Sequence, residues 1–544
     1  MKFGPFTWIT RIILVAALAL SAQVAAQAQT TNFRHYKLIA IGTFGGPASY
    51  INAPFALGAP NQINNGGTAV GAAATGTSIP PPPPIKQICG GIDGIVPFIF
   101  HAFEWEKGQR TDLGALGVSP SLECSEAVSI NANDEIAGSS GNGVIDPIAL
   151  QNGIPIEETR AVIWKNGEIK DLGTLGGNHS LAVAINERGQ VVGSAQNAIE
   201  DPFSLLYSPA GITNGTQSRA FLWHKGHMQD LGTLGGPDAQ AFALNESGQA
   251  AGISYINSTP DPVTGVPTAD PFLWTEGQGM IDLGSLGGVF GTAGLVNNRG
   301  QVVGVSSIAA DPGACVSTGG SGTATCHPFI WEGGKITDLN TETTGGNLVT
   351  ANALSDSGEI IGTATFPGRP ISDAYLWRKG IARDLGTVDD DCFSEAFGIN
   401  SRDQIVGQSF SCATNFPRTF LWENGAMIDL NTLAGPNSSL QLVEAFAIND
   451  RGEIGGIGVP SGCGIFSDDA CGHAFLLIPV CADGTEGCAD APLDPAIVAQ
   501  SRPLSASAPK TMTAEELATF KERIARMHAR IAGRNPGFGL WPKR

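Results

Sequence analysis

The chain has 544 residues, with 50 acidic against 31 basic side chains and a formal net charge of −19. Hydrophobic residues make up 42% of the chain, which excludes low-complexity disorder and collagen even though 72 Gly and 34 Pro are present. The acidic balance argues against a nucleic acid as the main partner, because phosphate binding needs a basic face.

Residues 1–28 have the features of a secretory signal peptide. Lys2 and Arg11 precede the apolar run Ile12–Leu20, and small residues that suit cleavage follow at Ala26 and Ala28. The run is too short to span a bilayer, and we expect no transmembrane span in the mature chain. The protein is therefore predicted to be exported, to the periplasm or the exterior, with a retained N-terminal anchor as the alternative.

An internal repeat fills residues 33–480. From Arg160 the chain reads RAVIWKNGEIKDLGTLGG and then AVAINERGQVVGSA, and from Arg219 the pattern returns as RAFLWHKGHMQDLGTLGG. A tryptophan recurs at intervals of 45 to 59 residues, at Trp105, Trp164, Trp223, Trp274, Trp331, Trp377 and Trp422. This period suits four short strands, and the sequence predicts an all-β fold, a β-propeller.

The order of the strands within a blade is inferred from connector lengths. The step from the tryptophan to the DLG aspartate is nearly constant, whereas the step from the QVVG run to the next aromatic run varies. Tight hairpins tend to join strands of one blade, so we expect strands one to four in the AFLW, DLG, AIN and QVVG runs. The N-terminal run near Ile41 and the C-terminal run His473–Leu477 would then pair and close a single ring of eight blades. Seven blades plus a stray unit, or an open solenoid, are the alternatives.

The turn after each AIN run has a recurring chemistry. Asn186 and Gly189 suit the first and last positions of a type I turn, with the glycine at positive φ. Asp134 and Asp403 replace this glycine in two repeats. Asp tolerates positive φ, so we expect the same turn there.

The HAFLW…DLGTLGG…AIN..GQVVG pattern over residues 38–478 resembles the HAF-repeat family of probable extracellular proteins. The triplet itself stands at His101–Phe103 and at His473–Phe475. The resemblance implies export and repetition, and it carries no catalytic residues to transfer.

The position before each aromatic strand is polar and differs between repeats. If the aromatic strand lines the central channel, these residues would ring its mouth and could bind an anionic or sugar-like ligand; a solvated strand start is the alternative. They are His101, Arg160, Arg219, Asp270, His327, Asp373, Arg418 and His473. The aspartates of the DLG runs, present in nearly every repeat, are predicted to be structural acceptors of backbone hydrogen bonds.

The long insertions should share one face, because the loops after the DLG and QVVG strands emerge on the same side, and such a face is the usual binding face of a repeat fold. Ten cysteines in an exported chain predict disulfides. Neighbours in sequence suggest the pairs Cys89 with Cys124, Cys315 with Cys326, Cys392 with Cys412, Cys463 with Cys471, and Cys481 with Cys488.

The composition changes after residue 480. Residues 481–512 are interpreted as a linker, residues 513–533 as an amphipathic basic helix that begins with a capping box, and residues 534–544 as a tail. The helix could adhere to a membrane surface, dock on a partner or pack on the acidic propeller.

No catalytic signature and no metal-ligand spacing stands out, and neither a cofactor nor a metal is expected. The leading hypothesis is a binding module that uses the insertion-rich face, without chemistry of its own, for a glycan, a small molecule or an envelope protein. The alternatives are a hydrolase or lyase acting on polysaccharides through the His, Asp and Arg residues of the ring, and an envelope scaffold docked by its C-terminal helix.

Overall fold

The structure is a computed structural model, and it describes residues 33–51, 61–78, 98–117, 123–151, 156–205, 215–317, 325–369, 371–414, 416–435, 438–463, 471–485 and 487–499. The predicted signal peptide, C-terminal helix and tail, and most of the second half of the predicted linker, lie outside these residues. Within them, no helix is both long and apolar enough to cross a membrane.

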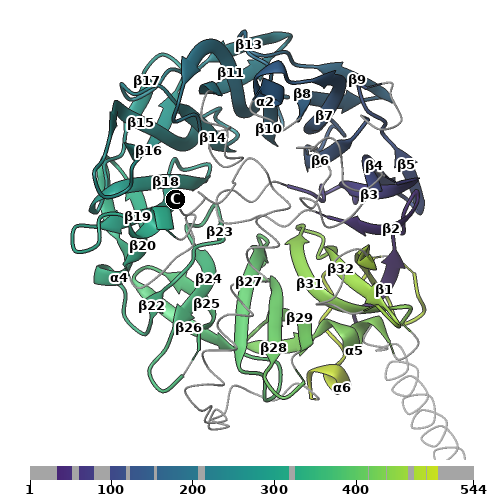
Figure 1. Ribbon diagram of the computed structural model, residues 1–544. Coiled ribbons are helices and arrows are strands. Elements are labelled where there is room, and N and C mark those ends of the chain that lie inside the picture. Colours follow the sequence, from purple (N-terminus) through teal and green to yellow (C-terminus); the bar gives the residue numbers. More distant parts are fainter. Residues whose placement is uncertain are drawn as a thin grey trace, which may run out of the picture.

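The protein is all-β, and its strands form seven sheets: five of four strands, one of five and one of eight. The sheets follow one another around a centre, a β-propeller-like arrangement (Figure 1). Five short helices complete the described part of the chain, namely α2 (Pro147–Gln151), α3 (Ala314–Ser317), α4 (Leu339–Glu342), α5 (Leu430–Ala434) and α6 (Pro495–Val498).

Each repeat contributes strands in a fixed order. The AIN runs form the first strands, β2 (Gly45–Tyr50), β6 (Ser125–Ile130), β10 (Ser180–Ile185), β14 (Ala239–Leu244), β18 (Gly287–Val296), β22 (Asn347–Leu348) with β23 (Ala353–Leu354), β27 (Phe393–Ile399) and β31 (Leu440–Ile448). The QVVG runs form the second strands, β3 (Ala69–Ser78), β7 (Ile136–Ile145), β11 (Val191–Asp201), β15 (Ala250–Pro260), β19 (Val302–Ile308), β24 (Ile360–Thr365), β28 (Ile405–Ser411) and β32 (Ile454–Pro460).

The aromatic runs form the third strands, β4 (Phe98–Glu106), β8 (Glu157–Lys165), β12 (Gly215–His224), β16 (Pro267–Thr275), β20 (Cys326–Glu332), β25 (Asp373–Arg378), β29 (Phe416–Glu423) and β33 (His473–Val480). The DLG runs form the fourth strands, β5 (Gln109–Asp112), β9 (Glu168–Asp171), β13 (His227–Asp230), β17 (Gly279–Asp282), β21 (Lys335–Asp338), β26 (Ile381–Gly386) and β30 (Ala426–Asp429), and beside β33 this place is taken by β1 (His35–Ala40).

The expected strand order was wrong. The aromatic strand is third in its sheet, not first, and the long variable connections join the second and third strands of one sheet. The connections between sheets vary in length as well: eight residues separate Asp171 from Ser180, and twelve separate Asp112 from Ser125. A hairpin within one sheet can carry an insertion of any length at its open end, so the length of a connection does not mark the boundary between sheets.

The two ends of the repeat region meet in one sheet. β1 pairs antiparallel with β33, from His35 opposite Val480 to Ala40 opposite Phe475. Part of the predicted linker returns to the same place, since the N–H of Arg34 donates to the carbonyl of Pro492 at 2.8 Å. These contacts join residues that lie more than 400 positions apart in sequence.

The core lies between neighbouring sheets. Trp164 of β8, 1% exposed, packs with Val70 of the preceding sheet and with Ala127 of β6. Two repeats further on, Phe272 and Trp274 occupy the corresponding third strand and are also buried. Burial of such a side chain is worth roughly 1.5 to 3 kcal/mol, so each contact between sheets has its own hydrophobic contribution.

The turns after the first strands have the predicted geometry. Gly189 has a φ of 67°, and the aspartates that replace this glycine, Asp134 and Asp403, have φ angles of 54° and 59°. The side-chain oxygen of the turn asparagine accepts hydrogen bonds from the backbone of its own turn. Asn186 Oδ1 accepts the N–H groups of Arg188 and Gln190, at 3.1 and 3.0 Å.

The same asparagine also joins its sheet to the next one. Asn186 Nδ2 donates to the carbonyl of Asn245, 3.1 Å away in the following repeat, and to Gln190 Oε1 of its own turn. Seven asparagines donate in this way, from Asn64 to Asn131, Asn131 to Asn186, Asn186 to Asn245, Asn245 to Asn297, Asn297 to Ser355, Asn400 to Asn449, and Asn449 to Asn64. Ser355 has no amide to donate, and in that repeat Asn352 Nδ2 donates to the carbonyl of Ala396 instead.

Replacement of Asn186 by Ala should be costly. It removes the acceptor of two backbone N–H groups and the donor to the Asn245 carbonyl, in a side chain that is 2% exposed. We expect the free energy of unfolding to fall by about 3 kcal/mol, measured by denaturant titration. Ser355→Ala is the matched control, because this side chain bonds only within its own turn, and it should cost much less. Equal losses in the two variants would contradict the role given to the asparagine.

Candidate functional site

The eight polar positions predicted as a ligand-binding ring lie in the third strands. Most of them meet the aspartate that ends the neighbouring fourth strand. The N–O distances are 2.9 Å for His101 and Asp112, 3.8 Å for Arg160 and Asp171, 3.1 Å for Arg219 and Asp230, 2.9 Å for His327 and Asp338, and 3.8 Å for Arg418 and Asp429. A basic side chain from the third strand thus faces a carboxylate from the fourth in five repeats.

The aspartates of the fourth strands also accept backbone hydrogen bonds, as predicted. In each of the seven repeats that has this aspartate, its Oδ1 accepts the N–H two residues further on. Asp171 accepts from Gly173 at 2.7 Å and Asp429 from Asn431 at 2.8 Å, and the others are Asp112, Asp230, Asp282, Asp338 and Asp384. The aspartate therefore supports the link to the next sheet, which follows it directly.

At three positions of the predicted ring, the residue itself is not a basic side chain in contact with a fourth-strand aspartate. Asp270 is 8% exposed and faces Asp282, and burial together with this second carboxylate raises its pKa to about 6. Asp373 is 1% exposed, and burial and Asp384 raise its pKa to about 7, although Arg369 lies 2.9 Å away. In the repeat of His473, Ala40 of β1 stands in place of the fourth-strand aspartate, and burial lowers the pKa of His473.

The central cavity, about 310 Å³ in volume, is lined by the first strands and their turns. Its walls include Ile130, Ile185, Leu244, Val296 and Ile399. None of the eight ring residues is among the residues that line it. The placement of the ring at the mouth of the channel depended on the aromatic strand being innermost, and the sheet topology contradicts that premise. A role of these residues in ligand binding stays a prediction.

The insertion face is the side on which second strands lead into third strands, opposite the asparagine turns. Four of the predicted disulfides are present: Cys315–Cys326, Cys392–Cys412, Cys463–Cys471 and Cys481–Cys488. The first three lie at the insertion ends of their sheets. Cys124 is also disulfide-bonded, and its predicted partner Cys89 lies outside the described residues. Several disulfides are typical of a protein that folds in an oxidising compartment.

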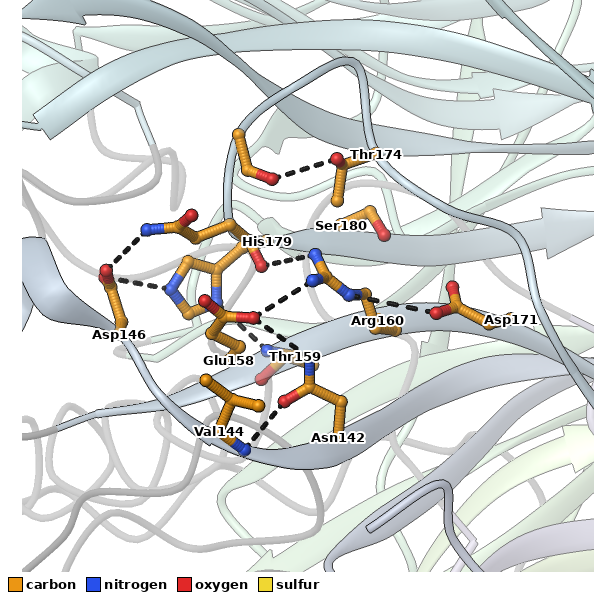
Figure 2. A network of polar contacts seen from close by, with 12 residues as sticks. Asn142, Val144, Asp146, Glu158, Thr159, Arg160, Asp171, Thr174, His179 and Ser180 are labelled. Atoms are coloured by element: carbon orange, nitrogen blue, oxygen red, sulfur yellow. Dashed lines mark hydrogen bonds and ion pairs between the residues drawn. The ribbon is translucent and has the colours of Figure 1, made fainter.

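A buried polar network lies at the base of one insertion (Figure 2). His179 and Asp146, both with fully buried side chains, are joined at 3.1 Å between Nε2 and Oδ2. His179 Nδ1 accepts the N–H of Thr159, so the ring proton is on Nε2 and is donated to Asp146. Asn178 Nδ2 donates to the other oxygen of Asp146 at 2.7 Å.

Arg160, a residue of the predicted ring, forms the other half of this network (Figure 2). Its guanidinium donates to the carbonyl of Asn178 at 2.6 Å and to Glu158 at 3.0 Å, and Glu158 also accepts from Asn142 Nδ2. With Asp171 on its remaining side, Arg160 is fully engaged by the protein itself. A ligand anion would have to compete with two carboxylates for it.

A motif that was not predicted from the sequence recurs in this region. Asn142 and Asp146 belong to NxxxDP, which returns in the next two repeats as Asn197–Pro202 and Asn257–Pro262. In each case the asparagine accepts the N–H two residues on, as Val144, Ile199 and Thr259 donate at 2.9 Å. The signal was visible as an Asn and an Asp-Pro at fixed spacing inside segments interpreted as variable.

Exposed apolar side chains gather on the insertion face. Among the described residues five large apolar side chains are exposed, and four of them belong to the insertion segments of three consecutive repeats. These four are Val144 at 49%, Leu150 at 55%, Ile199 at 58% and Val263 at 65%. Single exposed apolar side chains are common on protein surfaces, and what distinguishes these is that they recur in the insertion segments of consecutive repeats.

The described residues contain no group of three or more His, Cys, Asp or Glu side chains that could hold a metal ion.

No protein-family model and no curated protein matches the chain, and the resemblance to the HAF-repeat family stays a prediction. Solved structures similar to it include an acylaminoacyl peptidase of Pyrococcus horikoshii, at TM-score 0.36 and 11% identity over 80% of this chain and 59% of that one. A puromycin-hydrolyzing peptidase of Mycobacterium tuberculosis has TM-score 0.35 and 12% identity, over 61% of this chain and 49% of that one. A putative gluconolactonase has TM-score 0.24 and 11% identity, over 66% and 89%. The chain spans less than two thirds of the length of the two peptidases, and with scores this low no argument is drawn from any of the three.

Stability should fall as the pH rises through the titration of Glu157. Burial raises the pKa of this carboxyl from 4.5 to about 8, and the N–H of Gly143 is its one backbone donor. The folded protein therefore holds a proton that the unfolded chain has released between pH 4.5 and 8. Relative to the wild type, Glu157→Gln should gain roughly 1 kcal/mol per pH unit across this window, measured by thermal unfolding. Glu158→Gln is the control, and a similar gain there would refute the assignment.

Proposed function

We propose that the chain is an exported binding module that holds a partner or ligand on its insertion face, without chemistry of its own. The observation that carries this proposal is the recurrence of exposed aliphatic side chains, at Val144, Ile199 and Val263, in three consecutive insertions. Disulfides at the insertion ends add support, because cross-linked loops lose less conformational entropy when they bind. Export is supported by the signal-like residues 1–28 together with the disulfides.

The proposal includes a fold of eight blades closed into a ring. Two observations support this count. The eight-stranded sheet consists of two four-stranded units joined by a single parallel bridge, from Ala269 to Phe290, and β22 and β23 together occupy one first-strand position. Closure is supported by the pairing of β1 with β33 and by the hydrogen bond from Asn449 to Asn64.

Truncation tests the closure. A chain that starts at Ile41 lacks β1 and leaves the edge of β33 unpaired, and we expect its Tm to fall by roughly 5 °C or more. A chain that starts at Phe33 keeps β1 and should unfold like the longer protein. If both truncated chains unfold at the same temperature, the terminal strands do not close the ring.

Photo-crosslinking tests the binding face. A photoreactive residue at position 199, on the insertion face, should capture a discrete adduct in the cells that produce the protein. The same residue at position 166, in an exposed turn at the opposite end of the sheets, is the matched control and should not. In parallel, a glycan microarray is probed with the wild type and with a Val144→Ser, Ile199→Ser, Val263→Ser variant, which should lose at least about tenfold in signal. The proposal would be refuted if both positions gave equal adducts and the triple variant bound glycans as the wild type does. If the protein instead shortened the oligosaccharides, it would be an enzyme and not a binding module.

A further inference from the structure

The insertion face carries an excess of negative charge. The insertions of repeats two to five contain eight Asp and Glu residues and no Lys or Arg, counted over residues 142–159, 197–218, 256–270 and 308–326. The aspartates that end the fourth strands lie at the same side, and the side chains of Asp112, Asp171 and Asp230 are 41%, 42% and 39% exposed. Such a face attracts basic side chains.

The arginines at this end of the sheets do not balance the charge. Arg160 contacts both Glu158 and Asp171, and Arg418 contacts two carboxylates in the same way. Since each of these arginines is shared between two carboxylates, the face stays negative overall.

Exposed aliphatic side chains lie in the same segments. Val144, Ile199 and Val263 belong to three consecutive insertions, and exposed Ala198 and Glu200 flank Ile199. Val263 also lies beside Gly313, in the connection between β19 and β20 of the next repeat. Aliphatic groups next to carboxylates match a helix that has an apolar stripe and basic flanks.

The chain itself supplies a segment with this pattern, in the predicted C-terminal helix outside the described residues. Over residues 513–533 the apolar stripe consists of Leu517, Phe520, Ile524, Met527 and Ile531, and the basic flanks of Lys521, Arg523, Arg526 and Arg530. An amphipathic helix owes most of its stability to the packing of its apolar stripe, so this segment needs a surface.

The charges of the two regions are opposite. Residues 500–544 contain nine Lys and Arg against three Glu, whereas residues 31–480 contain 20 basic against 43 acidic side chains. An anionic membrane would attract the helix and repel the rest of the protein, whereas the insertion face attracts the helix without this cost.

The segment can reach the face. The described chain ends just after α6, whose Ile497 and Val498 pack against the hydrophobic cluster that contains Leu430 of α5. α5 belongs to the link from β30 to β31, at the insertion end of the sheets. Residues 500–512 span up to about 45 Å when extended, and a helix over residues 513–533 is about 30 Å long. Neighbouring packed sheets lie roughly 10 Å apart, so repeats two to four are within this reach.

We propose that residues 513–533 form a helix that lies on the insertion face of repeats two to four. Its apolar stripe covers Val144, Ile199 and Val263, and its basic side chains lie against the carboxylates around them. The tether gives the helix an effective concentration in the millimolar range, which favours it over a separate chain. A partner on this face would have to displace the helix, and this competition alone rests on the proposed function.

Photo-crosslinking within the purified full-length protein tests the docking. A photoreactive residue at position 199 should join residues 513–533 of the same chain, and mass spectrometry of the tryptic digest identifies the joined peptides. The same residue at position 166, at the opposite end of the sheets, is the matched control and should not. Salt at about 0.5 M should lower the yield at position 199 by roughly threefold or more, because it screens exposed charges.

Charge reversal identifies the segment that docks. The variant Lys521→Glu, Arg523→Glu, Arg526→Glu, Arg530→Glu should lower the yield by roughly fivefold or more, because carboxylates then face carboxylates. Lys543→Glu, Arg544→Glu, in the predicted tail, is the matched control and should crosslink as the wild type does. The proposal is overturned if position 199 joins two chains, joins no peptide of residues 513–533, or gives equal yields in the two variants.

A chain that ends at Met512 separates this proposal from the proposed function. In cells, position 199 of the shortened chain should capture roughly threefold more partner or better, because no helix has to be displaced. Internal crosslinks in the purified protein, with no partner adduct in cells from either chain, would refute the proposed function and leave the docking in place. Equal partner adducts from both chains, with no internal crosslink, would refute the docking and leave the proposed function in place.

Discussion

The hydrogen bond from one turn asparagine to the backbone of the next repeat is the interaction on which the arrangement of the sheets depends. Hydrophobic contacts between sheets are non-directional and tolerate sliding, whereas an amide that donates to one carbonyl sets a distance and an orientation. Each buried asparagine uses both of its polar atoms, so a displaced sheet would leave several polar groups unpaired at once. For this reason the asparagine turns are alike in most repeats, whereas the opposite ends of the sheets carry insertions of different lengths.

At the opposite end of the sheets, residues that recur in most repeats can be distinguished from residues that occur in one repeat only. In five repeats a His or Arg of the third strand contacts the aspartate of the fourth strand, so this pair belongs to the framework. Where the pattern breaks, as at Asp270, a buried carboxylate faces the aspartate in place of a basic side chain. A residue that differs from its counterparts in the other repeats is therefore a better candidate for a specific role than a residue that recurs. The corresponding residue of another repeat is then the control for a substitution.

The sequence was sufficient for features that rest on local chemistry. The positive φ of Asp134 and Asp403 and the four described disulfides follow from turn preferences and from short separations along the chain. The order of strands within a sheet could not be read correctly, because hydrophobic runs show that strands exist and not which neighbours they pair with. The network around His179 could not be predicted either, since it joins the residue after a second strand, a third strand, and the residues just before the next first strand.

The pairing of β1 with β33 has a consequence for the order of events during synthesis. β1 lies at the start of the repeat region, and its partner leaves the ribosome some 430 residues later. Until then the backbone groups of β1 have no partner strand, whereas the sheets in between can form one after another from local contacts. The pairing of the two ends therefore cannot form before almost the whole region has been made, and a chain that stops short of His473 keeps an unpaired edge that can associate with other chains.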